Sequence, residues 1–310
     1  MWRCLAVCSL LGALSLGIAG CGGGSDDSSD GELSFRQQVD KALQEKAHDV
    51  RAKKLIKIGY GQAKAQDVFG AEETMKLAAS ACEKVADPAA RAGVFAMLAE
   101  AQHGSGNRSQ ARTAMKSALA AVGQIEDVES KVRTLARVGR AQGAIKKVDA
   151  AVDTLKSAEE LAGGLEDVYA RTLVSASIAA SYEKIGRPAE SDRVVGAALV
   201  LAEMIGDERS RCEAIALIAA KQHAMGKKAE AAATFELALS SARKIEKLHS
   251  RAYAMIDIAQ KLSKAGDHAK THEILAEAEA ISENILDPGF KLQTLQEVRR
   301  LRATLPKPAE

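Results

Sequence analysis

A positively charged residue recurs at every fortieth position along most of this chain. The positions are Arg51, Arg91, Lys131, Arg171, Arg211, Arg251 and Lys291, with no insertion or deletion between them. Three further columns keep this period: alanines from Ala78 to Ala278, and aliphatic residues from Val85 to Ile285 and from Ile58 to Val298. A fixed period of this length indicates stacked repeats. Because one unit cannot bury its apolar face alone, neighbouring units must stack into one continuous array.

Each forty-residue unit is predicted to contain two helices. Alanine supplies 60 of the 310 residues, proline 5 and the aromatic residues 3%, a composition that favours helices over strands. In one unit, Ala231, Phe235, Ala238 and Ala242 follow at steps of four, three and four, and therefore lie on one helical face. Glycines between the two halves predict the left-handed residue that ends a helix; they are Gly106, Gly186, Gly226 and Gly266.

The boundaries of the array follow from the period. Asp87 and Asp287 each precede a proline, a pattern typical of an N-cap followed by the first helical residue. The array is predicted to span 34–305 as one unit, with six full helix pairs in 47–286, a half-repeat at each end and a tail at 306–310. The last half-repeat is rich in arginine and glutamine, and we expect it to cap the array.

The unit at 207–246 resembles the tetratricopeptide repeat family. An aliphatic Ile218 precedes the small Ala219, and Ala231, Phe235 and Ala238 keep the family's spacing of small, large apolar and small residues. The resemblance covers about 260 residues. Unlike the family's units, these have forty residues and lack its aromatic residues on the first helix. The resemblance implies an all-α fold, a right-handed α-solenoid of antiparallel helix pairs with 40-residue tetratricopeptide-like repeats.

The resemblance also implies where a partner binds. In that family, a protein or peptide lies on the concave surface built by the first helix of each unit. Alanines at 96, 136, 176, 180, 216 and 220 are expected to leave space on this surface. Carried over position by position, the candidate groove residues are Lys53, Tyr60, Glu100, His103, Arg133, Arg140, Glu183, Glu213, His223, Tyr253 and Gln260.

The first residues are typical of an export signal. Residues 1–20 combine a short basic start with an apolar run of about fifteen residues, too short to span a membrane. Ile18, Ala19, Gly20 and Cys21 resemble a bacterial lipobox, which implies that Cys21 carries lipid and anchors the chain to a membrane. The Gly-, Ser- and Asp-rich stretch at 21–33 is predicted to be a flexible tether. Gly22 after the cysteine favours the outer membrane, which predicts a chain in the bacterial cell envelope that faces the periplasm.

No catalytic cluster is evident in the sequence. It has no phosphate-binding loop, no Gly-x-Ser-x-Gly elbow and no His-Glu-x-x-His motif, so we expect no catalytic residues, metal or cofactor. His268 and His272 have a spacing that metal ligands use, but no third histidine or cysteine lies nearby in sequence. The formal charge of +2 does not favour nucleic acid as a partner. Aspartate four residues before most of the recurring cations suggests local ion pairs.

The leading hypothesis is therefore a non-enzymatic, lipid-anchored scaffold or adaptor of the cell envelope. Its partner would be a protein or peptide, and self-association of the array is a variant of this hypothesis. Two alternatives remain. One is an all-α enzyme or enzyme subunit of the envelope, and the other is a binder of an anionic polymer through the Arg/Lys column.

Overall fold

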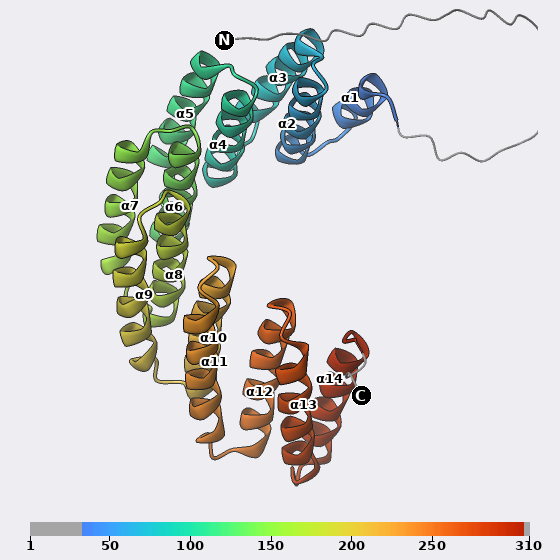
Figure 1. Ribbon diagram of the computed structural model, residues 1–310, viewed down its shortest axis with the longest axis vertical. Helices are drawn as coiled ribbons and strands as arrows, with labels where there is room; N and C mark the ends of the chain where they lie inside the picture. Colours follow the sequence, from blue (N-terminus) through green and yellow to red (C-terminus); the bar gives the residue numbers. More distant parts are fainter. Residues whose placement is uncertain (1–32, 307–310) are drawn as a thin grey trace, which may run out of the picture.

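The computed structural model describes residues 33–306, and these fold entirely into helices and turns with no strand. The signal segment, Cys21 and most of the predicted tether lie outside the described residues. Figure 1 shows the helices in an open arc. They are α1 (Phe35–Leu43), α2 (His48–Lys64), α3 (Val68–Glu83), α4 (Pro88–Gly104), α5 (Arg108–Gly123), α6 (Val128–Ala144), α7 (Val148–Gly163), α8 (Val168–Lys184), α9 (Pro188–Glu203), α10 (Glu208–Ala224), α11 (Lys228–Arg243), α12 (Leu248–Lys264), α13 (His268–Glu283) and α14 (Pro288–Ala303).

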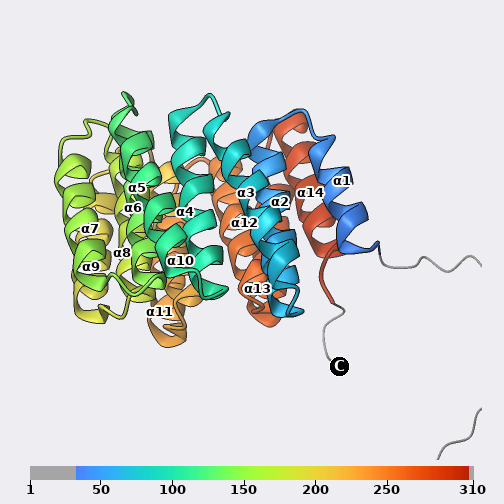
Figure 2. The same cartoon turned by 90° about the horizontal axis from the view of Figure 1, so that it is seen from above.

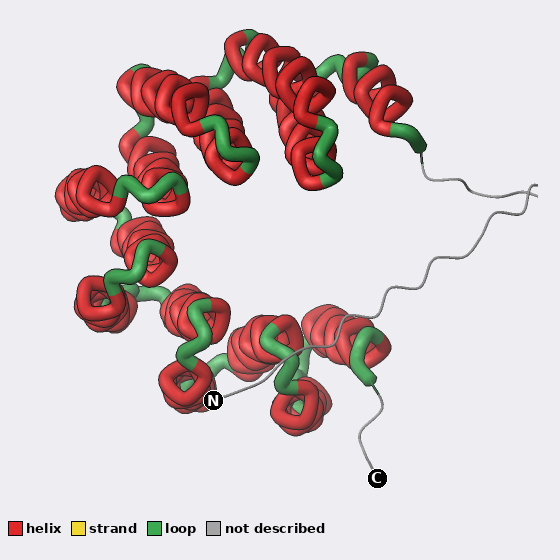
Figure 3. Tube along the Cα trace, turned by 45° about the horizontal axis from the view of Figure 1, so that its top comes forward, coloured by secondary structure: helices red, strands yellow, loops and turns green. Residues whose placement is uncertain are grey.

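The helices form two layers with different contacts. Each even-numbered helix packs against the odd-numbered helix that follows it and also against the next even-numbered helix. Successive odd-numbered helices make no comparable contacts within the described residues. Figure 3 shows an inner and an outer layer of helices around the arc. The labels of Figure 1 place even-numbered helices such as α6 and α8 inside and odd-numbered helices such as α7 and α9 outside, and all run roughly side by side across the array (Figure 2). The predicted solenoid of antiparallel helix pairs is confirmed.

The turn between the two helices of a unit has the predicted geometry. Gly106, Gly186, Gly226 and Gly266 all adopt φ between +76° and +87°, the left-handed region that costs glycine little. After Gly106, the amide of Asn107 donates to the carbonyl of Gln102 at 2.8 Å, which closes the helix end. In two units the same position holds Gln66 and Lys146, with φ of 64° and 63°. The conformation is therefore kept by the turn even where glycine is absent.

The recurring cation has a different role from the predicted one. Asp87, Asp127, Asp207 and Asp287 do cap their helices, each accepting a hydrogen bond from the amide three residues on. The interpretation of these aspartates as ion-pair partners of the cation four residues later is wrong, because no such pair is within ion-pair distance in the described part of the chain.

Instead, at every position of the column except Lys131, the cation donates to a carbonyl at or just after the end of the preceding outer helix. Arg91 Nη1 donates to the carbonyl of Val85 at 2.9 Å, and Arg251 Nε donates to that of Ile245 at 2.7 Å. Arg211 does the same with Ile205 at 3.1 Å. A positive charge beside carbonyls at a helix C-terminus is favourable. The column thus joins one repeat to the next.

Small residues allow the helices of a pair to approach closely. The alanine column is fully buried at all six positions, from Ala78 to Ala278. Cys82 and Cys212 are also buried and unpaired. Burial raises the pKa of the Cys82 thiol to about 12 and that of Cys212 to about 11, so both are inert core residues at neutral pH.

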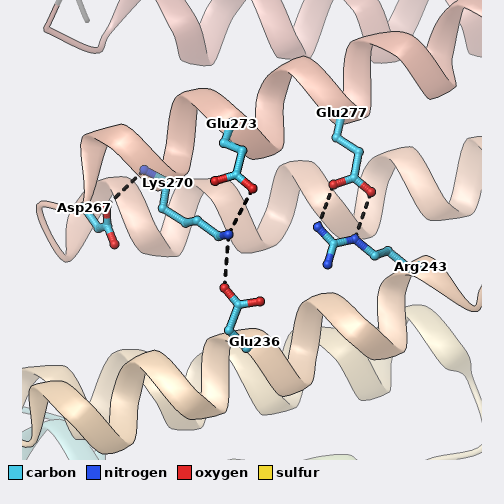
Figure 4. Close-up of polar contacts among 6 residues, drawn as sticks. All are labelled: Glu236, Arg243, Asp267, Lys270, Glu273 and Glu277. Carbon is cyan, nitrogen blue, oxygen red and sulfur yellow. Dashed lines mark hydrogen bonds and ion pairs between the residues drawn. The ribbon is translucent and has the colours of Figure 1, made fainter. Parts of the chain in front are cut away.

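Ion pairs connect outer helices that otherwise pack little. Figure 4 shows Arg243 of α11 holding both carboxylate oxygens of Glu277 on α13, at 2.9 and 2.7 Å. Lys270 Nζ lies 3.2 Å from the carboxylate of Glu236 on α11. Arg193 and Glu159 join α9 to α7 in the same manner. Pairs exposed to this degree contribute about 0–1 kcal/mol each, so the contacts between inner helices carry most of the array's cohesion.

Candidate binding surface on the inner helices

All eleven candidate residues lie on even-numbered helices, and none is buried in the core. They do not form one surface, however. His103 lines a small hollow with Arg108 and Arg112 of α5, and Glu183 Oε2 lies 3.0 Å from Lys227 Nζ at the next turn. His223 occupies the same column as these two residues. The structure therefore places this column at the turn edge of the array, beside the outer helices.

The inner surface of the last three even-numbered helices contains a hollow of about 440 Å³. Two candidate residues, Tyr253 and Gln260 of α12, line it. The other lining residues come from α10, α12 and α14, and most are polar: Arg209, Ile256, Asp257, Gln293, Gln296 and Glu297.

Several of these side chains hold one another in place. The Arg209 guanidinium lies 4.9 Å from the centre of the Tyr253 ring and donates to Asp257 Oδ2 at 3.1 and 2.8 Å. The Tyr253 hydroxyl donates to Gln293 Oε1 at 3.1 Å. The side chains of Gln260 and Gln296 make no hydrogen bond within the described residues. The hollow thus combines the ion pair of Arg209 and Asp257 with two side-chain amides, those of Gln260 and Gln296, whose donors and acceptors are free.

Three lining residues of this hollow, Arg209, Asp257 and Gln293, were not among the residues predicted from the sequence. The signal was present, since Arg209 and Asp257 lie four residues before Glu213 and four after Tyr253, one helical turn along the same face. Only two of the inner-facing columns were carried over from the family resemblance. The neighbouring columns, which add most of the charge, were not.

The polar surface continues from α12 towards α8. Lys261 Nζ lies 3.8 Å from Glu213 Oε1, and Glu213 lies beside Tyr169 of α8. Burial, together with the charge of Glu213, raises the pKa of Tyr169 to about 12. The phenol is therefore neutral at physiological pH and available as a hydrogen-bond donor.

Apolar side chains are partly exposed in the middle of the inner surface. Leu173 and Ala180 of α8 and Leu217 and Ala220 of α10 are partly exposed there. The expectation that the other alanines leave open space is wrong. Ala96, Ala136, Ala176 and Ala216 are buried, because they fill the contacts by which inner helices pack against their neighbours.

Towards the N-terminus the inner surface becomes more basic. Lys53 pairs with Asp49 at 2.8 Å and Arg133 with Glu129 at 2.8 Å. Lys64 lies 4.8 Å from the centre of the Tyr60 ring. Burial raises the pKa of Glu100 on α4, and the nearby Arg140 opposes this shift in part.

The described residues offer no metal centre. No three histidine, cysteine, aspartate or glutamate side chains in 33–306 lie close enough together to hold an ion. The pair His268 and His272 is not aligned on a common ligand, since His272 Nε2 contacts the carbonyl of Pro306 at 2.9 Å. None of the helices α1 to α14 is long and apolar enough to cross a membrane.

No protein-family model and no curated protein sequence matches the chain. Among solved structures, Ton1535 from Thermococcus onnurineus NA1 is 15% identical over 84% of this chain and 94% of its own, with a TM-score of 0.41. A putative kinesin light chain with nearly identical TPR-like repeats from Podosopora anserina is 19% identical over 64% of this chain and 97% of its own, at 0.34. A Rap protein complexed with competence and sporulation factor is 14% identical over 87% and 84%, at 0.33. The fold assignment therefore rests on this chain's own helices and period.

Proposed function

We propose that this chain is a non-enzymatic adaptor that binds a protein segment or peptide along the inner surface of its solenoid. The observation that best supports this proposal is the hollow lined by Tyr253, Gln260 and their neighbours on three successive inner helices. A bound peptide presents amides and carbonyls that must be satisfied, and the free amides of Gln260 and Gln296 supply matching donors and acceptors. The fixed pair of Arg209 and Asp257 limits the entropy lost on binding.

We further propose that the chain works at a membrane of the bacterial cell envelope. Cys21 ends a segment that resembles a lipobox, and the following residues are rich in glycine, serine and aspartate. Two acyl chains on one cysteine are enough for stable anchoring. Gly22 supports the outer membrane, with the solenoid facing the periplasm.

The recurring cations offer little support for an anionic polymer as ligand. Arg91, Arg211 and Arg251 each donate to a backbone carbonyl of the preceding helix. Their regular spacing is thus explained by the joint between repeats, and no ladder of free guanidinium groups is needed to account for it.

Site-specific photo-crosslinking in intact cells tests the adaptor proposal. A benzophenone amino acid replaces Gln260 in one strain, Tyr253 in a second and, as matched controls, the exposed Lys116 and Lys156 of the outer helices α5 and α7. We expect the two inner positions to crosslink to the same protein and the outer positions to yield no such product. Equal crosslinking from both faces, or none from the inner positions, refutes the proposal.

A further inference from the structure

Three cations on the inner face of α2 and α6 have no ion-pair partner within the described residues. They are Lys57 on α2 and Arg137 and Arg140 on α6, and all three are exposed. Lys53 and Arg133, one turn earlier on the same helices, are each neutralised by an acid four residues before them. Of the three remaining charges, only Arg140 has an acid nearby among the described residues, Glu100, and none of the three forms an ion pair with it.

Helix α4, which lies between these cations, has glycines at two positions where side chains of the neighbouring helices lie against its backbone. A Cβ placed on Gly93 of α4 would lie 2.5 Å from Nη1 of Arg137, so that guanidinium rests directly over the glycine. A Cβ on Gly104 would lie 2.9 Å from the ring of Tyr60 on α2. Arg137 and Tyr60 therefore reach over α4 from opposite sides. Glu100 is the one acidic residue on the face of α4 between them.

The other end of the inner surface is balanced in charge. Arg209 pairs with Asp257, and Lys261 lies near Glu213. The inner surface is thus polarised, with excess positive charge over α2 to α6 and paired charges over α10 to α14. Such polarisation would orient a ligand that carries acidic groups at one end.

We propose that the inner face of α2, α4 and α6 binds an acidic segment of a peptide, with carboxylates held by Arg137, Arg140 and Lys57. This inference rests on the proposed adaptor function and names its partner's chemistry. Arginine binds carboxylates through two parallel hydrogen bonds, which favours it at such a site. With α4 between them, α2 and α6 are separated by about 20 Å, a distance that about six extended residues span. The face lies on the inside of an arc, so a flat bilayer cannot reach it as an extended peptide can.

Binding to an unbiased peptide library tests this inference. The full chain, purified in detergent and fluorescently labelled, is applied to an array of random peptides about twelve residues long, enough to span about 40 Å. It is compared with Arg137→Gln/Arg140→Gln and with the matched outer-face control Lys116→Gln/Lys156→Gln. Circular dichroism melting of all three proteins checks that the fold is kept.

We expect the peptides bound most strongly to be enriched in aspartate and glutamate. For the best of them, the inner variant should bind about tenfold more weakly in solution, whereas the outer variant should stay within about twofold. Raising the salt from about 50 to about 300 mM should weaken the wild-type complex, and Glu100→Gln should strengthen it.

Three outcomes refute the inference. If neutral or basic peptides are selected and depend on Gln260, the acidic partner is wrong and the adaptor function stands. If no peptide binds, both proposals fail. If phosphatidylglycerol vesicles bind the chain through the same arginines while acidic peptides do not, the face is a membrane site instead.

Discussion

Two glycines in helix interiors should respond differently to the same substitution. Gly196 lies in the middle of the outer helix α9, is exposed, and has nothing within 4 Å of an added Cβ. Alanine there gains helix propensity at no steric cost, about 1 kcal/mol. We therefore expect Gly196→Ala to stabilise the array, raising the melting temperature by roughly 2–4 °C.

At Gly139 the same gain meets a clash. An added Cβ would lie 2.9 Å from both Cγ and Cδ2 of Leu155 and 3.4 Å from the carbonyl oxygen of Ala151, all on α7. Leu155 is fully buried, and its Cγ cannot move without shifting its neighbours. Overpacking of this kind costs about 1–3 kcal/mol. Set against about 1 kcal/mol of propensity, Gly139→Ala should be neutral to about 2 kcal/mol destabilising.

The two variants are compared by thermal unfolding followed by circular dichroism at 222 nm. Because the substitution is the same, the intrinsic backbone term cancels and the difference reports the contact between α6 and α7. If Gly139→Ala stabilises as much as Gly196→Ala does, the contact between Gly139 and Leu155 is not tight and α6 and α7 do not pack as closely as the structure shows. A melting curve in which helicity is lost in two separate steps would show that some units unfold before others, as repeat arrays allow.

Three further perturbations have defined outcomes. Ala238→Leu, in the fully buried alanine column, should cost about 1–3 kcal/mol in urea unfolding, whereas Lys228→Ala at the start of α11 should change the midpoint little. Burial raises the pKa of Glu100, so the contribution of its protonated carboxyl to stability is present at low pH and lost as the pH rises through the folded-state pKa. Glu100→Gln should therefore stabilise the protein more at pH 7 than at pH 4 in thermal melts. Cys21→Ser should abolish labelling by an alkyne fatty acid in cells that process lipoproteins, and an unlabelled wild type would contradict the lipid anchor.

The period of forty residues made the fold predictable from the sequence. Each column samples the same environment several times, so one noisy position does not obscure the pattern. This redundancy identified the buried alanines, the turn glycines and the aspartate caps, all of which the structure contains. A single helix pair with the same residues would have given far weaker evidence.

The site was less predictable because a column fixes a helical phase but not the direction of a long side chain. Arg91 could equally have reached Asp87 on its own helix or Val85 behind it, and only the structure shows the second contact. Likewise, the sequence gives no sign that Arg137 crosses to Gly93 forty-four residues earlier. Contacts between neighbouring units depend on how one unit is rotated relative to the next. The residues that recur every forty positions do not reveal this rotation.

Both ends of the array carry polar residues where the repeats need small ones. In α14, Gln296 and Arg299 are exposed at positions where α10 buries Ala216 and Ala219. The position of Arg299 holds glycine in α2 and α6, where an outer helix approaches so closely that a Cβ would lie 3.2 Å from Met75 or 2.9 Å from Leu155.

A long charged side chain at that position disfavours the close approach of another outer helix. At the other end, Gln38 of α1 occupies the column that is alanine in every full unit. Arg299 and Gln38 therefore disfavour self-association in which a second copy completes the half-repeats at the ends. In the described array the inner surface consists of the seven even-numbered helices from α2 to α14, so a partner longer than this surface must extend beyond it.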